Sequence, residues 1–421
     1  MNKKSVLIVC DLFPPAFGPR MGYLCKYLPL NGWNPVVITE KVDEKTFAFL
    51  AKDIDVTYIS FYKKSGIKGK IAWMWVFLRD TLFSYKDRRM YREVLKITKK
   101  QRFDLILCST YRTFPLRAAW LLSKKTKLPL IVDLRDILEQ YTGNEFISHR
   151  LPTFLGLDKC IASHFRKKNM RIRNEVLRHA VAVTTVSPWH VSTLTPYNAE
   201  TYLIYNGYDP ELFFPSEVES DTFYITYTGR LLSVAMRDPD LLFQAIQRLA
   251  EEGMVSPDML QVRWFVDRQS EKIIRGVVEK YPNIEAYMCY FDYVSASEIP
   301  AILNESAILL ILTNKADTNG PQGVMTTKFF EALAVEKPIL CVRGDEGCLE
   351  EVIHRTRSGL SAHNADEVYD FLKTRFICWK SHKPLDEPFD KEEIKKYSRE
   401  SQAKQFVQLL ENKICNYPSS S

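Results

Sequence analysis

The sequence predicts an α/β protein with two Rossmann-like domains built on parallel sheets. Short apolar segments rich in β-branched residues alternate with helix-length segments along most of the chain, which is typical of parallel sheets covered by helices. Turn residues break this alternation near residue 206 and indicate a domain boundary. The chain has 421 residues, 46% of them hydrophobic, so it can bury two or three cores.

Six strands are predicted in the first half of the chain. They span residues 5–10, 35–39, 56–60, 105–109, 129–134 and 181–187. The loop after the first strand, residues 13–20, lacks the Gly-x-Gly-x-x-Gly pattern, so we do not expect a nicotinamide or flavin dinucleotide there.

Positive charge is concentrated in residues 61–102, which hold 13 Lys and Arg against three acids, whereas the whole chain carries a net charge of +7. The apolar run 71–78, with Trp73 and Trp75, lies inside this segment. The flanking basic residues are Lys63, Lys64, Lys68, Lys70, Arg79, Lys86, Arg88 and Arg89. Aromatic residues beside cations suit an anionic membrane surface. A core helix with a solvated basic face is the main alternative, and nucleic acid is a weaker one because no nucleic-acid motif accompanies the charge.

The nine cysteines are scattered singly and form no Cys-x-x-Cys pair, which argues against a disulfide framework and a structural zinc site. The first apolar run ends before Asp11 and is too short for a signal peptide. No uncharged apolar stretch approaches the roughly 18 residues of a membrane span. We therefore predict a cytoplasmic protein without a spanning helix.

The turn signals Asn206-Gly207 and Asp209-Pro210 mark the predicted domain boundary. Strands are predicted after it at residues 223–228, 261–266, 284–289, 307–312 and 339–342. The stretch from Asp390 to Cys415 is amphipathic and charged. We predict domains at residues 1–205 and 206–390, followed at 391–421 by a helix and a polar tail.

Residues 306–342 predict one strand, loop, helix and strand unit, in which Thr326 or Thr327 caps the helix. Ligands of parallel sheets bind beyond the carboxyl ends of the strands, where loop amides and helix N-termini favour anions. Lys328 and Glu331 are therefore expected at a phosphate-binding site. Alternatively, Glu331 only stabilises the first helical turn or pairs with Lys328.

The pattern Gly-x4-Lys-Phe-Phe-Glu-Ala-Leu-Ala-x3-Pro-Ile, from Gly323 to Ile339, resembles the donor-binding signature of retaining GT-B glycosyltransferases of group 1, the family-four, glycogen-synthase-like kind. In that family two glutamates eight positions apart face a nucleotide sugar. Glu331 matches the second, which holds the ribose hydroxyls. The first falls on Gly323, so a backbone group must replace the carboxylate that contacts the sugar. The resemblance implies two Rossmann-like domains facing across a cleft, with the C-terminal helix crossing back to the first domain.

Further motifs extend the resemblance along the chain. Gly18 matches a glycine that lets the loop backbone approach the donor diphosphate; alternatively it is a plain turn glycine. Arg230 matches a diphosphate-binding arginine, and Arg237 matches a second cation by approximate spacing, unless it pairs with Asp238. Arginine suits this task because its planar fork makes bidentate contacts. The aromatic loop 290–293 lies where relatives receive the nucleotide base.

Asp136 ends the charged run that follows the fifth predicted strand, at the edge where a cleft is expected. The resemblance places this run near the acceptor, so Asp136 is a candidate for binding or deprotonating an acceptor hydroxyl. Alternatively, it caps a helix or pairs with Arg135. Many relatives have a histidine in this region, and this run has none.

The resemblance implies a hexosyltransferase-type enzyme that transfers a sugar from a nucleotide sugar to a glycan hydroxyl with retained configuration. Arg230, Lys328 and helix-end amides would stabilise the leaving diphosphate, so neither a metal nor a cofactor is expected. We expect a lipid-linked acceptor in cell-surface polysaccharide synthesis, such as capsule or O-antigen, and a peripheral position on the cytoplasmic face of the cell membrane. A nucleotide-sugar epimerase of GT-B fold and a non-catalytic nucleotide-sugar-binding subunit are the alternatives.

Overall fold

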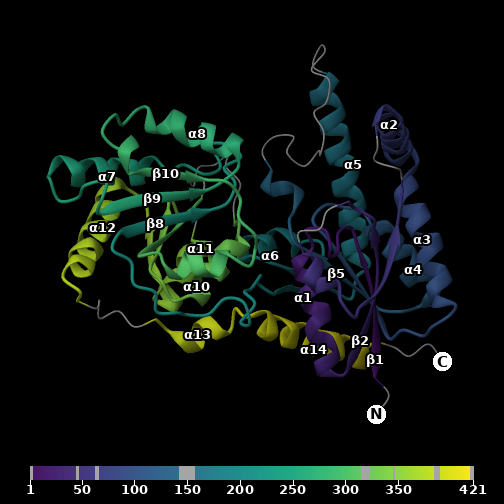
Figure 1. Cartoon of the computed structure of the whole chain (residues 1–421). Coiled ribbons are helices and arrows are strands. Elements are labelled where there is room, and N and C mark those ends of the chain that lie inside the picture. The colour runs from purple at the N-terminus through teal and green to yellow at the C-terminus, as the bar shows by residue number, and fades with distance from the viewer. Residues whose placement is uncertain are drawn as a thin grey trace. The chain divides into compact units, whose positions relative to one another are not determined.

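Two parallel sheets form the framework of the chain, one in each of two units (Figure 1). The computed structural model describes residues 3–43, 47–61, 66–141, 157–313, 323–344, 347–383 and 389–417. The first unit contains Met1–Tyr205 and Gln402–Ser421, and the second contains Asn206–Ser401. The division falls at the predicted turn signals, whereas residues 391–401 lie in the second unit rather than in the returning segment.

The first sheet has seven strands in the order β3-β2-β1-β4-β5-β6-β7, all paired in parallel. The strands are β1 (Lys4–Cys10), β2 (Trp33–Glu40), β3 (Asp55–Ile59), β4 (Leu105–Thr110), β5 (Leu130–Leu134), β6 (Ala182–Thr185) and β7 (Thr201–Leu203). All six predicted strands are present. The strand order reverses between β1 and β4, which makes this edge of the sheet a position where ligands of such folds bind.

Helices cover both faces of this sheet. They are α1 (Pro19–Tyr27), α2 (Gly66–Phe83), α3 (Tyr85–Thr98), α4 (Leu116–Thr126), α5 (Leu157–His179), α6 (Pro188–Leu194) and the part of α14 (Arg399–Cys415) that follows Ser401. Successive residues of β1 point to opposite faces: Leu7 packs in a core with residues of α3 and α4, and Ile8 in a core with residues of α1 and α14. Both faces are therefore buried, which accounts for the continuous apolar run.

The second sheet has six parallel strands in the order β10-β9-β8-β11-β12-β13. They are β8 (Phe223–Thr228), β9 (Leu260–Phe265), β10 (Met288–Phe291), β11 (Ile308–Leu312), β12 (Ile339–Val342) and β13 (Gly359–Ala362). The strand predicted at 284–289 is partly wrong, because η5 (Glu285–Tyr287) is a 3-10 turn that buries Ile284 and Tyr287 before β10 begins. The predicted fold class of two Rossmann-like α/β domains is confirmed.

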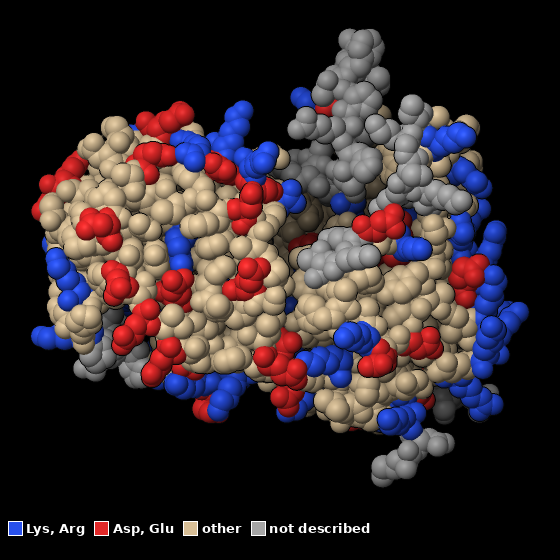
Figure 2. Space-filling view, in the orientation of Figure 1, with Lys and Arg blue, Asp and Glu red and all other residues tan. Residues whose placement is uncertain are grey.

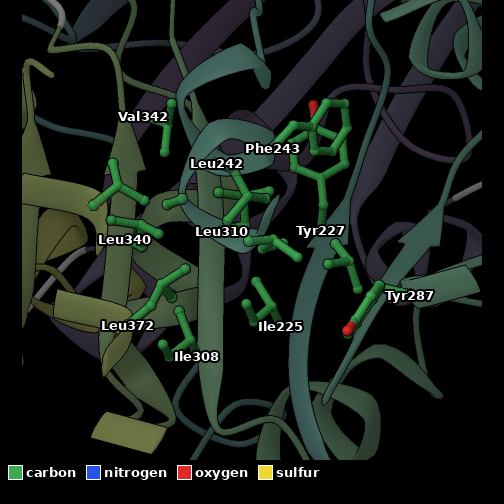
Figure 3. Packing of buried hydrophobic residues seen from close by; sticks show 14 of the residues in the cluster. Ile225, Tyr227, Leu242, Phe243, Tyr287, Ile308, Leu310, Leu340, Val342 and Leu372 are labelled. Carbon is green, nitrogen blue, oxygen red and sulfur yellow. The ribbon is translucent and has the colours of Figure 1, made fainter. Parts of the chain in front are cut away.

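The helices of the second unit are α7 (Asp240–Glu251), α8 (Arg268–Val278), α9 (Ile299–Asn304), α10 (Thr327–Ala334), α11 (Cys348–Thr356), α12 (Ala365–Lys380) and α13 (Lys391–Lys395). Figure 3 shows one core of this unit, in which Ile308 and Leu310 of β11 pack with Leu242 of α7 and Leu372 of α12. The core fixes the carboxyl ends of β8 and β11, and the candidate residues follow these ends.

The linker between the units is held by backbone contacts within the second unit. Tyr208 forms a parallel bridge with Ser398, in which Tyr208 N donates to Tyr397 O at 3.1 Å and Arg399 N donates to Tyr208 O at 2.8 Å. A Cβ at Gly207 would lie 2.4 Å from Tyr397 O, so the close approach requires glycine. Along the described ranges, no helix has the length and apolar character of a membrane span.

Candidate functional site

The turn after β8 joins two of the predicted cations. The buried Tyr227 hydroxyl donates to the carbonyl of Arg230 at 3.2 Å, and the guanidinium of Arg237 contacts the same carbonyl and lies 3.4 Å from the Tyr227 oxygen. A Cβ at Gly229 would lie 2.9 Å from this hydroxyl oxygen, so the turn requires glycine. The backbone of Arg230 and the side chain of Arg237 therefore meet at one point.

The guanidinium of Arg230 is oriented by one carboxylate and remains 61% exposed. Its Nε donates to Oδ2 of Asp267 at 2.9 Å, and Asp267 also caps α8 by accepting from Ser270 N at 2.8 Å. Hydrogen bonds from Ser270 lower the pKa of Asp267 and keep it charged. Because one carboxylate occupies only part of a guanidinium, Arg230 retains donors for a further anion.

Lys328 and Glu331 lie in the first turn and a half of α10, partly buried and close to further charges. Burial lowers the pKa of Lys328. The negative charge of Glu331 opposes this shift, and the positive charge of Arg237 adds to it. Burial also raises the pKa of Glu331, against the attraction of Lys328 and Arg399. These couplings bring Arg237, Lys328, Glu331 and Arg399 into one charged cluster. Arg399 is 1% exposed, and the sequence analysis missed it.

Thr326 is the N-cap of α10, and Thr327 is its first residue. The Thr326 side chain makes no capping hydrogen bond to the described helix, so first-turn amides remain for an anion. Gly323, at the position of the first family glutamate, is buried with φ +59°. This left-handed conformation favours glycine over a residue with a side chain. Residues 314–322 before it lie outside the described residues.

The alternative for Arg237, an ion pair with Asp238, is wrong. Asp238 pairs with Arg343 instead, whose guanidinium lies 3.4 Å from Asp238 and 3.6 Å from Asp240. The Asp-x-Asp sequence at 238–240 is thereby bound to an arginine. Among the described residues, no group of three or more His, Cys, Asp or Glu side chains is placed to hold a metal ion.

The aromatic segment at the end of β10 exposes two rings, Phe291 at 43% and Tyr293 at 54%. One face of Phe291 stacks on Phe265, with ring centroids 4.7 Å apart, and the Tyr293 hydroxyl lies 3.4 Å from Asp267. Tyr293 is thus tied to the carboxylate that orients Arg230. A planar base could stack on this exposed ring.

Gly18 is the N-cap of α1 in the first unit, with φ −139°. A Cβ there would lie 2.8 Å from both Leu12 O and Phe13 Cα. The loop's own packing therefore requires glycine at this position, for close approach rather than for a left-handed turn. The helix N-terminus behind it has no side-chain cap.

A buried ion pair crosses the edge of the first sheet. Asp133 of β5 accepts from Arg20 Nη2 at 2.9 Å and from the hydroxyls of Ser109 and Thr184, each at 2.8 Å. Burial would raise the pKa of Asp133, but Arg20 and these hydroxyls lower it. Arg20 also donates to the carbonyl of Ile204 at 2.9 Å. This network is structural and holds the carboxyl ends of β4, β5 and β6 together.

Asp136 lies at this edge, and neither alternative predicted for it is correct. Arg135 pairs with Asp11 instead, and Ile137 is the N-cap of the short helix η3 (Leu138–Gln140). Oδ1 of Asp136 accepts from Nε2 of Gln140 at 2.9 Å. Burial raises the pKa of Asp136, and the hydrogen bond from Gln140 and the charge of Arg135 oppose this shift. A carboxylate with a raised pKa is a better general base near neutral pH.

Gln140 is itself held by His190, and the sequence analysis missed both residues. The two side chains are buried, with Nε2 of His190 3.0 Å from Oε1 of Gln140 and Nδ1 3.1 Å from the Thr185 hydroxyl. Burial lowers the pKa of His190 to about 4, so the ring is neutral near pH 7. His190 of α6 thus contacts Gln140, which in turn contacts Asp136.

Residues 20–212 match the model of Glycosyltransferase Family 4. This match covers most of the first unit and the first residues of the second, and the resemblance to group 1 GT-B glycosyltransferases is confirmed. Sucrose-phosphate synthase from Thermosynechococcus elongatus has the same fold, with a TM-score of 0.65 and 13% identity over 97% of this chain and 98% of that chain.

HepE of Anabaena in complex with UDP has a TM-score of 0.64 and 14% identity, over 97% of this chain and all of its own. The lipopolysaccharide outer core galactosyltransferase WaaB has a TM-score of 0.59 and 13% identity, over 97% and 99%. At these identities the likeness establishes the GT-B fold. No curated protein sequence matches the chain significantly. The family match over residues 20–212 and the GT-B fold together support a glycosyltransferase of GT-B type.

Proposed function

We propose that the protein transfers a sugar from a nucleotide-sugar donor to a hydroxyl of a lipid-linked glycan, with retained anomeric configuration and without a metal. The observation that carries the donor part is the charged cluster of Arg237, Lys328, Glu331 and Arg399 in the second unit. Three cations and one carboxylate can bind a diphosphate and the two hydroxyls of a ribose in one place. HepE binds UDP, so uridine nucleotides are the first donors to test.

In this proposal Arg230, Lys328 and the first amides of α10 bind the diphosphate and stabilise its charge as the sugar departs. Arg237, Thr326 and Thr327 complete the donor site, and the Glu331 carboxylate accepts from the ribose hydroxyls. Asp136 binds or deprotonates the acceptor hydroxyl, which attacks from the face that the diphosphate leaves. Gly18 keeps its loop compact, so that backbone amides rather than side chains face a phosphate.

The donor site is tested with purified protein and a panel of nucleotide sugars, beginning with UDP-glucose. We expect one donor to raise the melting temperature and to be hydrolysed slowly, and the anomeric coupling of the product to show retention. The R230Q variant should bind this donor more weakly by roughly 1.5 to 3 kcal/mol. Arg248, another exposed arginine paired with carboxylates, gives the control variant R248Q.

Two results would contradict a transferase. Interconversion of two nucleotide sugars would show an epimerase, and tight binding without hydrolysis or transfer to any lipid-linked acceptor would show a binding subunit. Equal donor affinity of R230Q and the parent would reject the assignment of Arg230.

The lipid-linked acceptor is proposed from the surface of α2. Ile71, Met74, Trp75, Leu78 and Leu82 recur every three or four residues, and each is between 47% and 61% exposed. They form one apolar face of the helix, which we call the α2 apolar face. Trp73 is different, because it stacks on Phe77 at 5.3 Å, which in turn stacks on Phe165 of α5 at 6.3 Å. Trp75 rather than Trp73 is therefore free to enter a membrane.

Basic side chains accompany this face. Figure 2 shows Lys and Arg gathered along the side of the first unit that carries α3. Lys68 is exposed, whereas Lys63 and Lys64, and the side chain of Lys70, lie outside the described residues. Each cation near an anionic bilayer adds roughly 1 kcal/mol of attraction. We propose a peripheral position on the cytoplasmic face of the cell membrane.

This position is tested by co-sedimentation with anionic and zwitterionic vesicles. Binding should weaken between 0.1 and 1 M salt, as the Debye length falls from about 10 Å to about 3 Å. The W75S/L82S variant should bind less than the parent, whereas L30S/L232S, which removes two exposed leucine side chains elsewhere, should not. Equal pelleting of all variants with both lipids would remove the membrane proposal.

A further inference from the structure

A cavity of about 400 Å³ lies where α2 ends and α3 begins. Four arginines, Arg79, Arg88, Arg89 and Arg92, line it together with Phe83 and Tyr85. Glu93 is the acid among its lining residues, and it binds Lys96 at 2.9 Å. A cavity of this size accommodates a small ligand, and its lining makes it strongly cationic.

The sequence at the helix junction gathers these arginines. Ser84 has φ +49°, which ends α2 and lets α3 start in a new direction. On α3, Arg92 follows Arg88 by four residues and Arg89 by three, so it lies on the same side of the helix as both. Tyr85 holds two of the arginines: the guanidinium of Arg79 lies 4.4 Å from its ring centroid, and Nη1 of Arg89 lies 3.3 Å from its hydroxyl.

The four guanidiniums are not neutralised by nearby acids. Within the described part of the chain, no carboxylate forms an ion pair with Arg79, Arg88, Arg89 or Arg92. The neighbouring acid Asp87 points elsewhere and accepts from Ala118 N of α4 at 3.0 Å. Like charges this close repel one another, and an anion bound among them would relieve the repulsion.

The geometry points to a phosphate ligand on an apolar chain. Guanidinium forks bind phosphate oxygens bidentately and remain charged at all physiological pH values. Phe83 lines the cavity and is 58% exposed, and it follows Leu82 at the end of the α2 apolar face. We propose that this cavity binds the phosphate or diphosphate headgroup of a membrane lipid whose chains lie along the α2 apolar face.

This inference rests on the proposed membrane position and makes it specific. It assigns one defined headgroup site to the first unit. Diffuse electrostatic attraction to the membrane would require no defined site. A phosphomonoester headgroup should therefore bind more tightly than a phosphodiester headgroup at equal surface charge. The donor site in the second unit uses other residues, so the two sites can be tested separately.

The test is co-sedimentation with phosphatidylcholine vesicles that contain either phosphatidic acid or phosphatidylglycerol, at matched zeta potential. The parent should prefer phosphatidic acid. The R88Q/R92Q variant should bind these vesicles about tenfold more weakly, a difference of about 1.4 kcal/mol. The control K99Q/K100Q removes two positive charges from the exposed end of the same segment, outside the cavity, and should change binding less than twofold.

A second variant, R88K/R92K, keeps the charge but removes the planar forks. It should retain binding to phosphatidylglycerol vesicles and lose the preference for phosphatidic acid. All three variants should keep the parent's melting temperature and its affinity for the nucleotide-sugar donor. Loss of donor binding in E331Q would report on the donor site alone, so failure of one proposal is distinguishable from failure of the other.

Three results would overturn the headgroup site. Equal losses in R88Q/R92Q and K99Q/K100Q would mean diffuse attraction. Saturable binding of inorganic pyrophosphate without any vesicle preference would identify a free phosphate compound as the ligand. Tighter binding of a single-stranded oligonucleotide than of phosphatidic acid vesicles, lost in R88Q/R92Q, would identify nucleic acid.

Discussion

Nε2 of His190 lies 3.0 Å from Oε1 of Gln140, and the amide nitrogen of the same glutamine donates to Asp136 at 2.9 Å. Ile137 N also donates to Oε1 of Gln140, at 3.2 Å, which identifies this atom as the oxygen. His190 therefore carries its proton on Nε2, and its Nδ1 lies 3.1 Å from the Thr185 hydroxyl, which donates to Leu134 O at 3.0 Å. A neutral histidine thus fixes the glutamine that orients the candidate base.

We expect the Q140L variant to shift the acidic limb of the kcat/KM profile to higher pH. The Gln140 hydrogen bond lowers the pKa of Asp136 against the effect of burial, so its loss raises that pKa and leaves less carboxylate at a given pH. The control is Q244L, which removes a glutamine that donates to Asp240 at 2.8 Å in the second unit. An acidic limb that does not move would exclude Asp136 as the group that must be ionised.

The E331Q variant should bind the donor more weakly by roughly 1.5 to 3 kcal/mol at pH 8, because a charged acceptor of the ribose hydroxyls is lost. Burial raises the pKa of Glu331, so the parent's affinity should fall as the pH is lowered through that value, above the ordinary 4.5. The affinity of E331Q should be flat over the same range. Calorimetric titration between pH 5 and 8 measures both. Parallel curves for parent and variant would contradict the assignment.

Asp87 should make the first unit less stable as the pH rises. Burial, reinforced by Asp80, raises the pKa of Asp87 from 3.8 to about 7, against the hydrogen bond from Ala118 N. The folded state therefore binds a proton more tightly than the unfolded state, and the free energy of unfolding falls between about pH 4 and pH 7. Asparagine keeps the acceptor for Ala118 N and removes the charge.

The free energy of unfolding of D87N should accordingly equal that of the parent near pH 4. It should exceed the parent's by roughly 2 to 4 kcal/mol at pH 8, since each pKa unit corresponds to about 1.4 kcal/mol. Denaturant titrations at the two pH values measure the difference. D55N, at an exposed position in the same unit, is the control. A gain that is the same at both pH values would contradict the prediction.

The G207A variant should destabilise the second unit by roughly 1 to 3 kcal/mol, because its Cβ would lie 2.4 Å from Tyr397 O and the backbone must move. It should also weaken donor binding, since Tyr397 is two residues from Arg399, whose charge lowers the pKa of Glu331. At Gly276 of α8 a Cβ meets nothing within 4 Å, so G276A should gain roughly 0.5 to 1 kcal/mol. Thermal unfolding measures both, and a stable G207A with unchanged affinity would contradict this account.

Most strands could be predicted because burial on both faces leaves a continuous apolar run, as in β1 and β11. β13, Gly359–Ala362, was missed because Gly-Leu-Ser-Ala is short and has no β-branched residue. β7 was missed because it has only three residues. The local apolar pattern thus predicts every interior strand and the edge strand β3, and it overlooks the short edge strands β7 and β13.

The candidate site was predictable where its residues are local in sequence. Lys328 and Glu331 lie three residues apart on one helix, and Gly229 and Arg230 follow one strand. The charge of Arg399 acts on Glu331 from 68 residues away in the sequence, and His190 contacts Gln140 across 50 residues, so no local pattern indicates either interaction. Trp73 and Trp75 are equivalent in the sequence, and only the stack on Phe77 separates them.

Helix α14 begins in the second unit and, from Gln402, belongs to the first. Ala403, Phe406, Leu409 and Leu410 pack there against β1 and α1, in the core that contains Val6, Ile8 and Leu24. The ribosome makes these four residues after the whole of the second unit. The first unit therefore stays incomplete during synthesis, and the part of this sheet face that α14 covers stays exposed until α14 emerges. A chain that stops before residue 402 would expose that apolar face permanently and should aggregate.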